Sequence, residues 1–211
     1  MVIAIDGPAG AGKSSVARGV ADALGWTYLD SGAMYRSVAL AALERDCDLD
    51  DPGAMADLAR SLRIDLDREV SLDGRPVGEE IRRPEVGAAA SRASVHPGVR
   101  EAMVARQREL IGAGRYVAEG RDIGTVVSPD APLKFFLTAI DGERARRRSE
   151  QIGQPHDQVL RDQRQRDARD RAREHGALRP AGDAVEIDTT GLTLDQVIDR
   201  VVGLARERGL A

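Results

Sequence analysis

The sequence is poor in the residues that mark several common protein classes. Its single cysteine, Cys47, excludes an internal disulfide and a thiolate cluster for zinc. The longest purely apolar run spans residues 38–43, whereas a membrane-spanning helix needs roughly 20 such residues. No basic, apolar leader precedes Asp6. We therefore expect no membrane span and no secretory signal, and we expect a cytoplasmic protein.

Aromatic residues are also scarce, with one tryptophan, three tyrosines and two phenylalanines. These are too few for a platform on which nucleic-acid bases stack. The formal net charge of −4 likewise argues against a nucleic-acid coat. What is present is a chain of 211 residues, 42% hydrophobic and 31% charged, which is the composition of a globular domain with at most a small insert.

Short apolar runs alternate with stretches of helical periodicity, which is typical of an α/β fold with a parallel sheet. The run at 2–5 is wholly apolar, as expected of a buried central strand. We expect five strands and three helices in this pattern: strands at 2–5, 27–29, 116–118, 133–138 and 185–187, and helices at 13–24, 34–43 and about 193–208.

Residues 46–96 interrupt this alternation. Pro52 follows two aspartates as at a helix start, residues 64–67 alternate in polarity, and Asp73-Gly74 is a strong hairpin-turn dipeptide. A small β-containing insert is the simplest interpretation. We expect one domain over 1–211, with a core at 1–45, 97–145 and 175–211, an insert at about 46–96 and a helical lid at about 146–165.

One motif matches the pattern G-x-x-x-x-G-K-[ST] in full between the first expected strand and the first expected helix. Backbone N–H groups of such a loop surround phosphate oxygens, the lysine reaches the β- and γ-phosphates, and the hydroxyl ligates Mg²⁺. A glycine-rich turn with a chance lysine is disfavoured by the flanking strand and helix. The predicted ATP-binding residues are Gly7, Pro8, Ala9, Gly10, Ala11, Gly12, Lys13, Ser14 and Ser15, with Ser14 as the metal ligand.

This loop does not by itself define the reaction. GTPases read their base with an Asn-Lys-x-Asp-type motif, and the sequence contains no asparagine. The chain is also too short for most motor-type ATPases. A kinase that acts on a small molecule is favoured.

Two further polar loops follow expected strands, where open parallel sheets bind ligands. The first contains Ser31 and Arg36, and the second contains Glu119, Arg121 and Asp122. Arginine grips phosphate with two N–H groups, and aspartate accepts from the exocyclic amine of a base. The alternatives are an ordinary N-cap turn for the first loop and a solvated Arg–Asp turn for the second.

Arginines concentrate near the end of the chain: residues 141–180 hold eleven arginines and eight acids. Helical spacing places Arg166, Arg169, Asp170 and Arg173 on one face. Phosphoryl transfer needs cations that close over phosphates and exclude water, so we interpret this region as a lid. A salt-bridged helix pair accounts for many of the arginines individually, and a nucleic-acid patch is a third interpretation.

Taken together, the motifs resemble those of bacterial cytidylate kinases, which are nucleoside monophosphate kinases. The specific ones are Asp30-Ser31-Gly32-x-x-Tyr35-Arg36, Gly120-Arg121-Asp122-x-Gly124-Thr125 and Arg166-Asp167-x-Arg169-Asp170, and the resemblance extends over about residues 2–208. It implies a P-loop fold, an enlarged monophosphate-binding insert, and transfer of phosphate from ATP to CMP or dCMP with Mg²⁺. A monomer is expected.

The resemblance also implies roles for individual residues. Ser31, Arg36, Arg121 and Arg173 would surround the CMP phosphate. Ser91, Arg100 and Asp122 would read the cytosine, and Arg166 and Asp170 would meet the ribose. Arg147 and Arg148 would approach the ATP phosphates, with Lys13, Arg121 and Arg147 as catalytic residues. Glu119 stands where the family usually has an aspartate.

Two other functions stay open on the sequence alone. A small P-loop kinase could take another acceptor, such as AMP, dTMP or shikimate. A binding module could instead respond to ATP and use the basic lid on RNA or on a partner protein, with salt-sensitive polynucleotide binding as its mark.

Overall fold

The computed structural model describes residues 1–66 and 69–210, and these form two compact units. The first unit comprises Met1–Leu29 and Ile111–Ala211, and the second comprises Asp30–Leu110. Each unit has its own apolar core. The insert expected at about 46–96 lies within the second unit.

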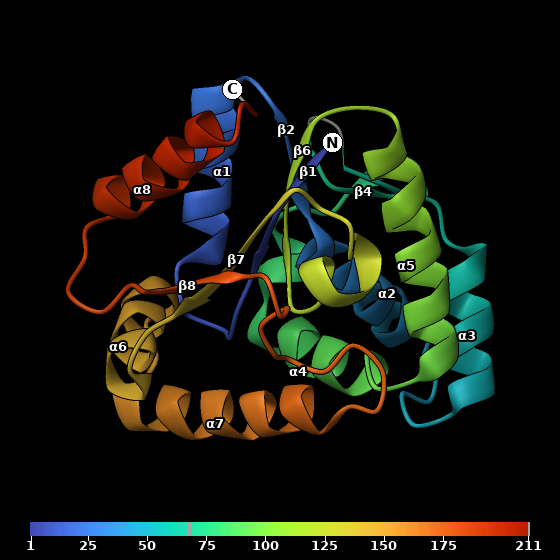
Figure 1. Cartoon of the computed structure of the whole chain (residues 1–211). Helices are drawn as coiled ribbons and strands as arrows, with labels where there is room; N and C mark the ends of the chain where they lie inside the picture. The colour runs from blue at the N-terminus through green and yellow to red at the C-terminus, as the bar shows by residue number, and fades with distance from the viewer. Residues whose placement is uncertain (67–68, 211) are drawn as a thin grey trace. The chain divides into compact units, whose positions relative to one another are not determined.

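A five-stranded sheet forms the centre of the first unit (Figure 1). Its strands lie in the order β2 (Thr27–Asp30), β6 (Tyr116–Gly120), β1 (Val2–Asp6), β7 (Leu133–Thr138) and β8 (Val185–Asp188). Central β1 is buried along its whole length and runs parallel to β6 and β7, and β7 runs parallel to β8. The five predicted strands and the parallel α/β fold are thus confirmed.

Helices α1 (Lys13–Leu24) and α8 (Leu194–Glu207) pack against each other, and both contribute to the core with the sheet. Both were predicted within a few residues. Thr193 caps α8: its side chain accepts from the backbone of Gln196, whose side chain accepts in return from the backbone of Thr193. The first unit also contains η2 (Ile123–Val127), a single π-helical turn, and the contacting helices α6 (Asp141–Ile152) and α7 (His156–Ala172).

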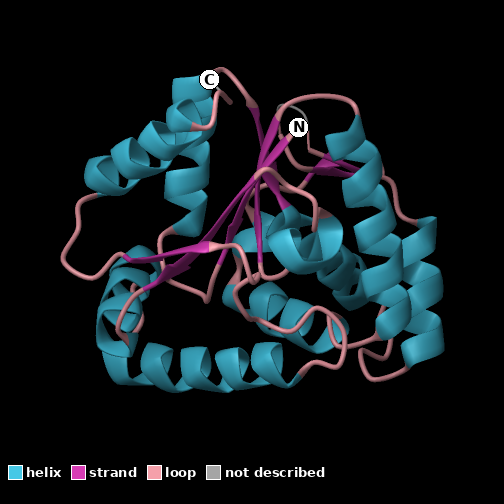
Figure 2. Ribbon diagram, viewed as in Figure 1, coloured by secondary structure: helices cyan, strands magenta, loops and turns pink. Residues whose placement is uncertain are grey.

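The second unit is mainly helical (Figure 2). Its α2 (Ser31–Glu44) packs against α4 (Pro84–Ala93), and the remaining elements are α3 (Pro52–Ser61), η1 (Glu80–Arg82), α5 (Pro97–Gly112) and the strands β3 (Ile64–Asp65), β4 (Ser71–Leu72) and β5 (Arg75–Pro76). Our sequence analysis missed α4 and α5. The buried face of α4 is mostly alanine, which gives a weak apolar period.

The predicted hairpin is present, with β4 pairing antiparallel to both β3 and β5. Asp73 and Gly74 join β4 to β5 with φ values of 51° and 83°, as in the tight turns that match strand twist. Pro52 begins α3 as predicted, and the Asp51 side chain caps it. Asp67, the last residue of the expected alternation, lies outside the described residues. No helix among the described residues is long and apolar enough to cross a membrane.

Candidate active site

The phosphate-binding motif forms the connection between β1 and α1. Gly7 has a φ of 146°, and a Cβ atom there would lie 2.1 Å from the backbone oxygen of Leu137. Gly10 has a φ of 76°, and its Cβ would lie 2.8 Å from the backbone oxygen of Arg144. Both positions require glycine because of the conformation and because backbone atoms approach so closely. The loop is therefore shaped by its neighbours as well as by its own sequence.

Lys13 is buried at the first turn of α1, with 6% of its surface exposed. Its Nζ donates to the backbone oxygen of Pro8 at 2.8 Å, across the loop. Burial, and next the positive charge of Arg121, lower the pKa of Lys13 from 10.5 to about 7, and the charge of Glu119 opposes this shift. Because Lys13 is buried among other cations, the electrostatic potential around it is positive and favours binding of an anion.

Ser14 and Ser15, by contrast, are exposed at the start of α1. Gly12 precedes the helix in a left-handed conformation and offers no side chain to cap it. The N-terminal N–H groups of α1 and its dipole are thus available to a phosphate. The hydroxyl of Ser14 lies where it can meet solvent, nucleotide or a metal ion carried by nucleotide.

Asp6, which our sequence analysis did not assign, links this loop to the next one. Its carboxylate accepts from the backbone N–H groups of Ile123 at 2.9 Å and Gly124 at 2.8 Å. Burial raises the pKa of Asp6 to about 6 despite these hydrogen bonds, and the charge of nearby Asp122 adds to the rise. Asp6 directly precedes Gly7, so one residue holds the start of η2 against the phosphate-binding loop.

Three of the predicted acceptor-binding residues form one network. Asp170, with 1% of its side chain exposed, pairs with Arg121 at 2.9 Å through Oδ2. Its Oδ1 pairs with Arg173. Burial alone would raise the pKa of Asp170, but the charges of Arg121 and Arg173 outweigh it and keep the pKa below its ordinary value. Asp170 therefore holds two phosphate-type arginines on the same unit as Lys13.

Arg166 and Asp122 belong to the same electrostatic cluster. The charge of Arg166 lowers the pKa of both Asp170 and Lys13, so its guanidinium lies near each of them. Asp122 is 5% exposed, and its charge acts on Asp6. Arg121, Arg166 and Asp122 thus lie near Lys13 or Asp6, at the two ends of the predicted donor loop.

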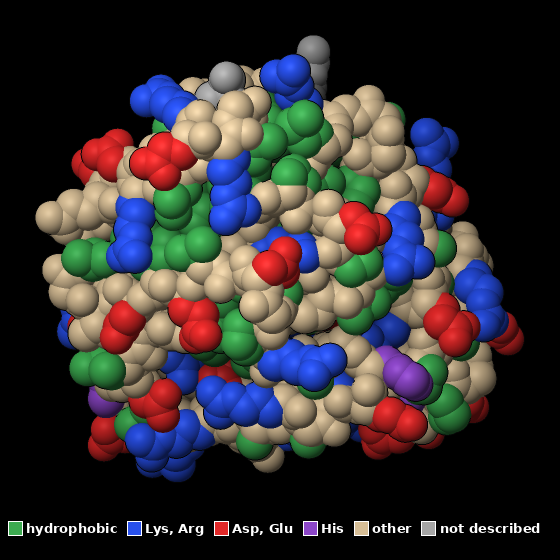
Figure 3. Space-filling model, in the orientation of Figure 1, with side chains coloured by type: hydrophobic (Ala, Val, Ile, Leu, Met, Phe, Trp, Pro, Cys, Tyr) green, Lys and Arg blue, Asp and Glu red, His purple; other side chains and the backbone are tan. Residues whose placement is uncertain are grey.

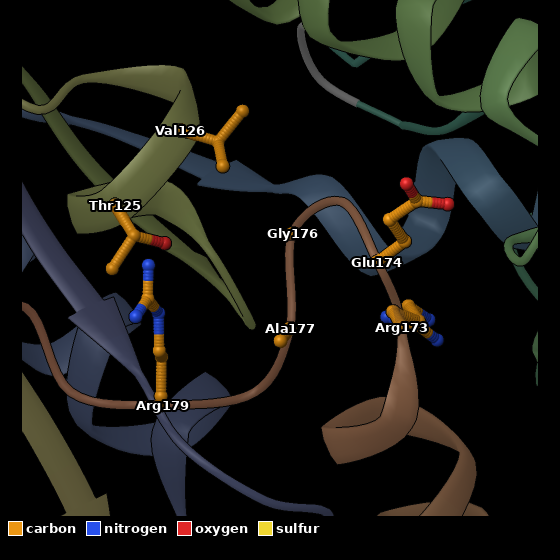
Figure 4. A pocket seen from close by; sticks show the side chains of 7 residues that line it. All are labelled: Thr125, Val126, Arg173, Glu174, Gly176, Ala177 and Arg179. Carbon is orange, nitrogen blue, oxygen red and sulfur yellow. The ribbon is translucent and has the colours of Figure 1, made fainter.

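A pocket of about 300 Å³ opens beside Arg173 (Figure 4). Thr125 and Arg179 lie on one side of it in this view, and Arg173 and Glu174 lie on the other. Within the described part of the chain, the buried hydroxyl of Thr125 has no hydrogen-bond partner. Two guanidinium groups, a hydroxyl and the carboxylate of Glu174 thus line this pocket.

Arg147, predicted to approach the ATP phosphates, lies on α6 and contacts the end of β8. It donates to the side chain of Glu143 at 3.0 Å and to the hydroxyl and backbone oxygens of Thr189 at 3.1 and 2.9 Å. The hydroxyl of Thr189 shares its one proton between two backbone oxygens, that of Thr138 at 3.0 Å and that of Ala11 at 3.3 Å. Arg147 is thereby connected to the phosphate-binding loop through Thr189. Arg148 follows it on α6.

The remaining predicted residues belong to the second unit. Ser31 is buried at the first position of α2, and Asp30 caps this helix by accepting from the N–H of Ala33 at 2.8 Å. Asp30 also pairs with Arg36 at 2.9 Å. The N-cap interpretation of this motif is therefore correct for Asp30, and the same carboxylate orients the predicted phosphate ligand Arg36.

Ser91 and Arg100, the predicted base readers, are buried in the second unit, with 3% and 5% exposed. The hydroxyl of Ser91 has no partner among the described residues. The Arg100 side chain donates to the backbone oxygen of Ser94 at 3.5 Å and lies 5.6 Å from the centre of the Tyr35 ring. That these residues meet the acceptor together with Arg121 and Asp122 stays a prediction.

Three more residues around the phosphate-binding loop escaped our sequence analysis. Tyr28 donates to Glu119, Thr189 donates to Ala11, and Arg144 donates to Ala9. Arg144 is one of eleven arginines between 141 and 180, and nothing in its sequence position distinguishes it from the others. Tyr28 lies on β2 and Thr189 directly follows β8. These are the two edge strands, and each is separated from β1 by one other strand, so the sequence alone does not show that they lie near the loop after β1.

A strand–loop–helix phosphate cradle with a buried lysine, at the carboxyl edge of a parallel sheet, defines a P-loop nucleotide-binding protein. A Thermus thermophilus crystal structure supports the fold, with a TM-score of 0.52, 21% identity, and coverage of 98% of this chain and 96% of that one. Residues 3–207 match the family profile described as cytidylate kinase. The chain belongs to the cytidylate kinase family.

Similarity to individual members extends over almost the whole chain. A cytidylate kinase from Bordetella bronchiseptica is 48% identical over 97% of this chain and 95% of its own length. One from Mycolicibacterium paratuberculosis is 48% identical over 99% and 96%, and one from Klebsiella pneumoniae is 45% identical over 98% and 96%. The family predicted from the three motifs is thus confirmed.

Proposed function

We propose that this chain transfers the γ-phosphoryl group of ATP to CMP or dCMP, giving ADP and CDP or dCDP. One observation carries the proposal. The phosphate-binding loop with Lys13 and the network of Arg121, Asp170 and Arg173 lie in the same unit, within electrostatic reach of each other. Membership of the cytidylate kinase family supports cytidine nucleotides as the acceptors.

Binding of the donor follows from the loop geometry. The backbone N–H groups of the loop, which Pro8 alone lacks, donate to the β- and γ-phosphates, and the dipole of α1 favours their negative charge. Lys13 adds a positive charge at close range. The charges of Lys13, Arg121 and Arg166 repel one another. Bound phosphate relieves that repulsion, and the same cations stabilise the charge that develops on the transferred group.

The donor set at the start of α1 fits a magnesium ion. Mg²⁺ takes oxygen ligands and usually binds through one or two protein groups together with phosphates and water. The exposed hydroxyl of Ser14 supplies such an oxygen beside the loop, and Glu119 supplies a buried carboxylate near Lys13. We propose that Ser14 would hold Mg²⁺ together with the nucleotide, and the ion would supply positive charge beside the phosphates.

On the acceptor side, Arg121 and Arg173 grip the phosphate of CMP from the first unit, and Ser31 and Arg36 add to that grip from the second. Asp122, Ser91 and Arg100 pair with the cytosine, and Arg166 and Asp170 meet the ribose. A phosphate acceptor is already an anion near pH 7, so no strong general base is required. Arg147 and Arg148 approach the donor phosphates as α6 and α7 close. A monomer in the cytoplasm that binds no nucleic acid stays our prediction.

Release of ADP from ATP and Mg²⁺ tests the proposal directly. The acceptors are CMP, dCMP, UMP, AMP, dTMP and shikimate in separate reactions, with Lys13→Ala as the matched variant that lacks the buried charge. Fast turnover with CMP and dCMP, lost in Lys13→Ala, is the expected result. Turnover with AMP, dTMP or shikimate instead would contradict CMP as the acceptor. Salt-sensitive polynucleotide binding without acceptor-dependent turnover would show that the chain is a binding module and not a kinase.

A further inference from the structure

Arg144 differs from the other arginines of the lid region in its burial. Charged side chains of both signs are interspersed over the face of the molecule shown in Figure 3. Arg146 is typical of them, with 53% of its side chain exposed and two acidic partners on its own helix. Arg144, two residues earlier on α6, has 3% of its side chain exposed.

The buried guanidinium of Arg144 has four partners. It donates to the backbone oxygen of Ala9 at 2.7 Å, to that of Ala139 at 3.2 Å and to Asp141 at 2.7 Å. Its fourth partner is the carboxylate of Asp167 on α7, which forms an ion pair with it at 2.8 Å without hydrogen-bond geometry. The Asp167 side chain is 2% exposed. Two opposite charges buried this deeply are stable only when paired. Arg144 thus joins α6, α7 and the phosphate-binding loop.

The bond to Ala9 has a consequence for the phosphate cradle. In a planar trans peptide the C=O and the next N–H point in opposite directions. Arg144 fixes the oxygen of Ala9, so the N–H of Gly10 points away from Arg144. Lys13 holds the oxygen of Pro8 in the same way, at 2.8 Å. Two peptide groups of the loop are thereby held by charged side chains.

The backbone of Arg144 also meets the loop. Its carbonyl oxygen would lie 2.8 Å from a Cβ at Gly10, and the same oxygen accepts from the side chain of Gln163 on α7 at 3.2 Å. Gly10 therefore lies against α6 and α7, with no space for a side chain. Helices α6 and α7 thus support the loop at Gly10, the same residue whose N–H is oriented by the bond from Arg144 to Ala9.

We infer that Arg144, held by Asp167, is a positioning residue for the donor: it orients the N–H of Gly10 toward the β- and γ-phosphates of a nucleoside triphosphate. This inference rests on the proposed function, since the phosphates are those of ATP. Arg144 touches no phosphate and acts through the peptide of Ala9 and Gly10. It should therefore affect binding of the donor and leave binding of the acceptor unchanged.

The test compares Arg144→Lys, Asp167→Asn and wild type, with Arg200→Lys as the matched control. Lysine keeps the charge beside Asp167, but a single ammonium group cannot reach all four partners. Asp167→Asn keeps the guanidinium and removes its buried counter-charge. Arg200 is an exposed arginine of α8, outside the region interpreted as a lid. Each protein is assayed for the KM of ATP, the KM of CMP and the shift in melting temperature produced by ADP.

In Arg144→Lys the KM of ATP should rise at least about tenfold, from the usual strength of a hydrogen bond made by a charged group. The KM of CMP should stay within about twofold, as for sites that do not interact. The ADP-induced shift should shrink, and Asp167→Asn should change the same two readouts in the same direction. Arg200→Lys should match wild type in every assay.

A lower melting temperature in Arg144→Lys with an unchanged KM of ATP and an unchanged ADP shift would overturn the inference and leave a structural role only. Asp167→Asn decides by the same readouts if Arg144→Lys does not fold. Failure of the proposed function is distinguishable, because wild type would then show no CMP-dependent turnover. An ADP shift in wild type that shrinks in Arg144→Lys would in that case still support the role of Arg144 at the donor loop, and an equal shift in both proteins would overturn it.

Discussion

Tyr28 donates a hydrogen bond of 2.5 Å from its phenol hydroxyl to Oε1 of Glu119. Glu119 is 4% exposed and lies on β6 in register with Ile5 of β1, one residue before Asp6. Its charge raises the pKa of Lys13 and of Arg121. Tyr28 also contacts α1, because the centre of its ring lies 4.5 Å from the guanidinium carbon of Arg18. Tyr28 thus connects the surface of α1 to the carboxylate that faces the buried cations.

Replacing Tyr28 by phenylalanine should lower both stability and kcat. The variant removes one hydroxyl and leaves Glu119 with one donor fewer, at a cost of about 1–3 kcal/mol in the free energy of unfolding. A carboxylate held less firmly should also reduce kcat severalfold without a matching rise in the KM of CMP. Urea unfolding and initial rates measure the two effects.

Tyr116→Phe is the control for Tyr28→Phe. Tyr116 is a half-buried tyrosine of the same sheet, and in the described structure its hydroxyl makes no hydrogen bond. Equal losses in both variants would show that the bond to Glu119 contributes nothing specific.

The lowered pKa of Lys13 predicts a pH dependence of donor binding. Burial, and next the charge of Arg121, lower it to about 7, so the free protein loses this positive charge as pH rises above 7. The kcat/KM for ATP should therefore fall through this range, because that ratio reports groups of the free enzyme. A kcat/KM that is constant from pH 6 to 9 would contradict the prediction.

Stability should change in the opposite direction. The unfolded chain keeps the ordinary Lys13 pKa of 10.5, so between pH 7 and 10.5 it binds more protons at this residue than the folded protein does. The folded state therefore gains stability from Lys13 as pH rises through this window, and that gain is absent below pH 7. Urea unfolding measures the free energy of unfolding of wild type and of Lys13→Met at each pH. The difference, wild type minus variant, should increase with pH between 7 and 10.5.

Gly7→Ala and Gly203→Ala should change stability in opposite directions. An alanine Cβ at Gly7 would lie 2.1 Å from the backbone oxygen of Leu137, at a φ of 146°. Strain and displacement of β7 should cost more than about 2 kcal/mol. Gly203 lies inside α8 with open space around a Cβ, so alanine there should add about 0.5–1 kcal/mol. Urea unfolding measures both, and a stabilised Gly7→Ala would contradict the described loop geometry.

Much of the first unit was predictable because its signals are local. The apolar run before Asp6, the glycine motif and the periodicity of 13–24 depend only on neighbours in sequence. The same holds for the helix start at Pro52 and the turn at Asp73-Gly74. Each was confirmed within a few residues.

What the sequence did not show depends on contacts between distant segments. Eleven arginines of similar context lie between 141 and 180, and only the packing of α6 and α7 against Gly10 makes Arg144 the buried one. Tyr28 bonds Glu119, and Asp6 bonds the start of η2 after β6, because the order β2-β6-β1 makes the strands that carry residues 28, 119 and 6 neighbours. Strand order leaves no mark on local periodicity, so these roles were missed.

The support of the phosphate-binding loop divides between two kinds of cation. A guanidinium stays protonated at any pH at which the protein folds, whereas the ammonium of Lys13 has a pKa of about 7. Arg144 thus contributes the form of the loop and Lys13 contributes charge that varies with pH. In mildly alkaline solution the molecule keeps a well-formed cradle whose attraction for phosphate has weakened, so loss of affinity there requires no loss of structure.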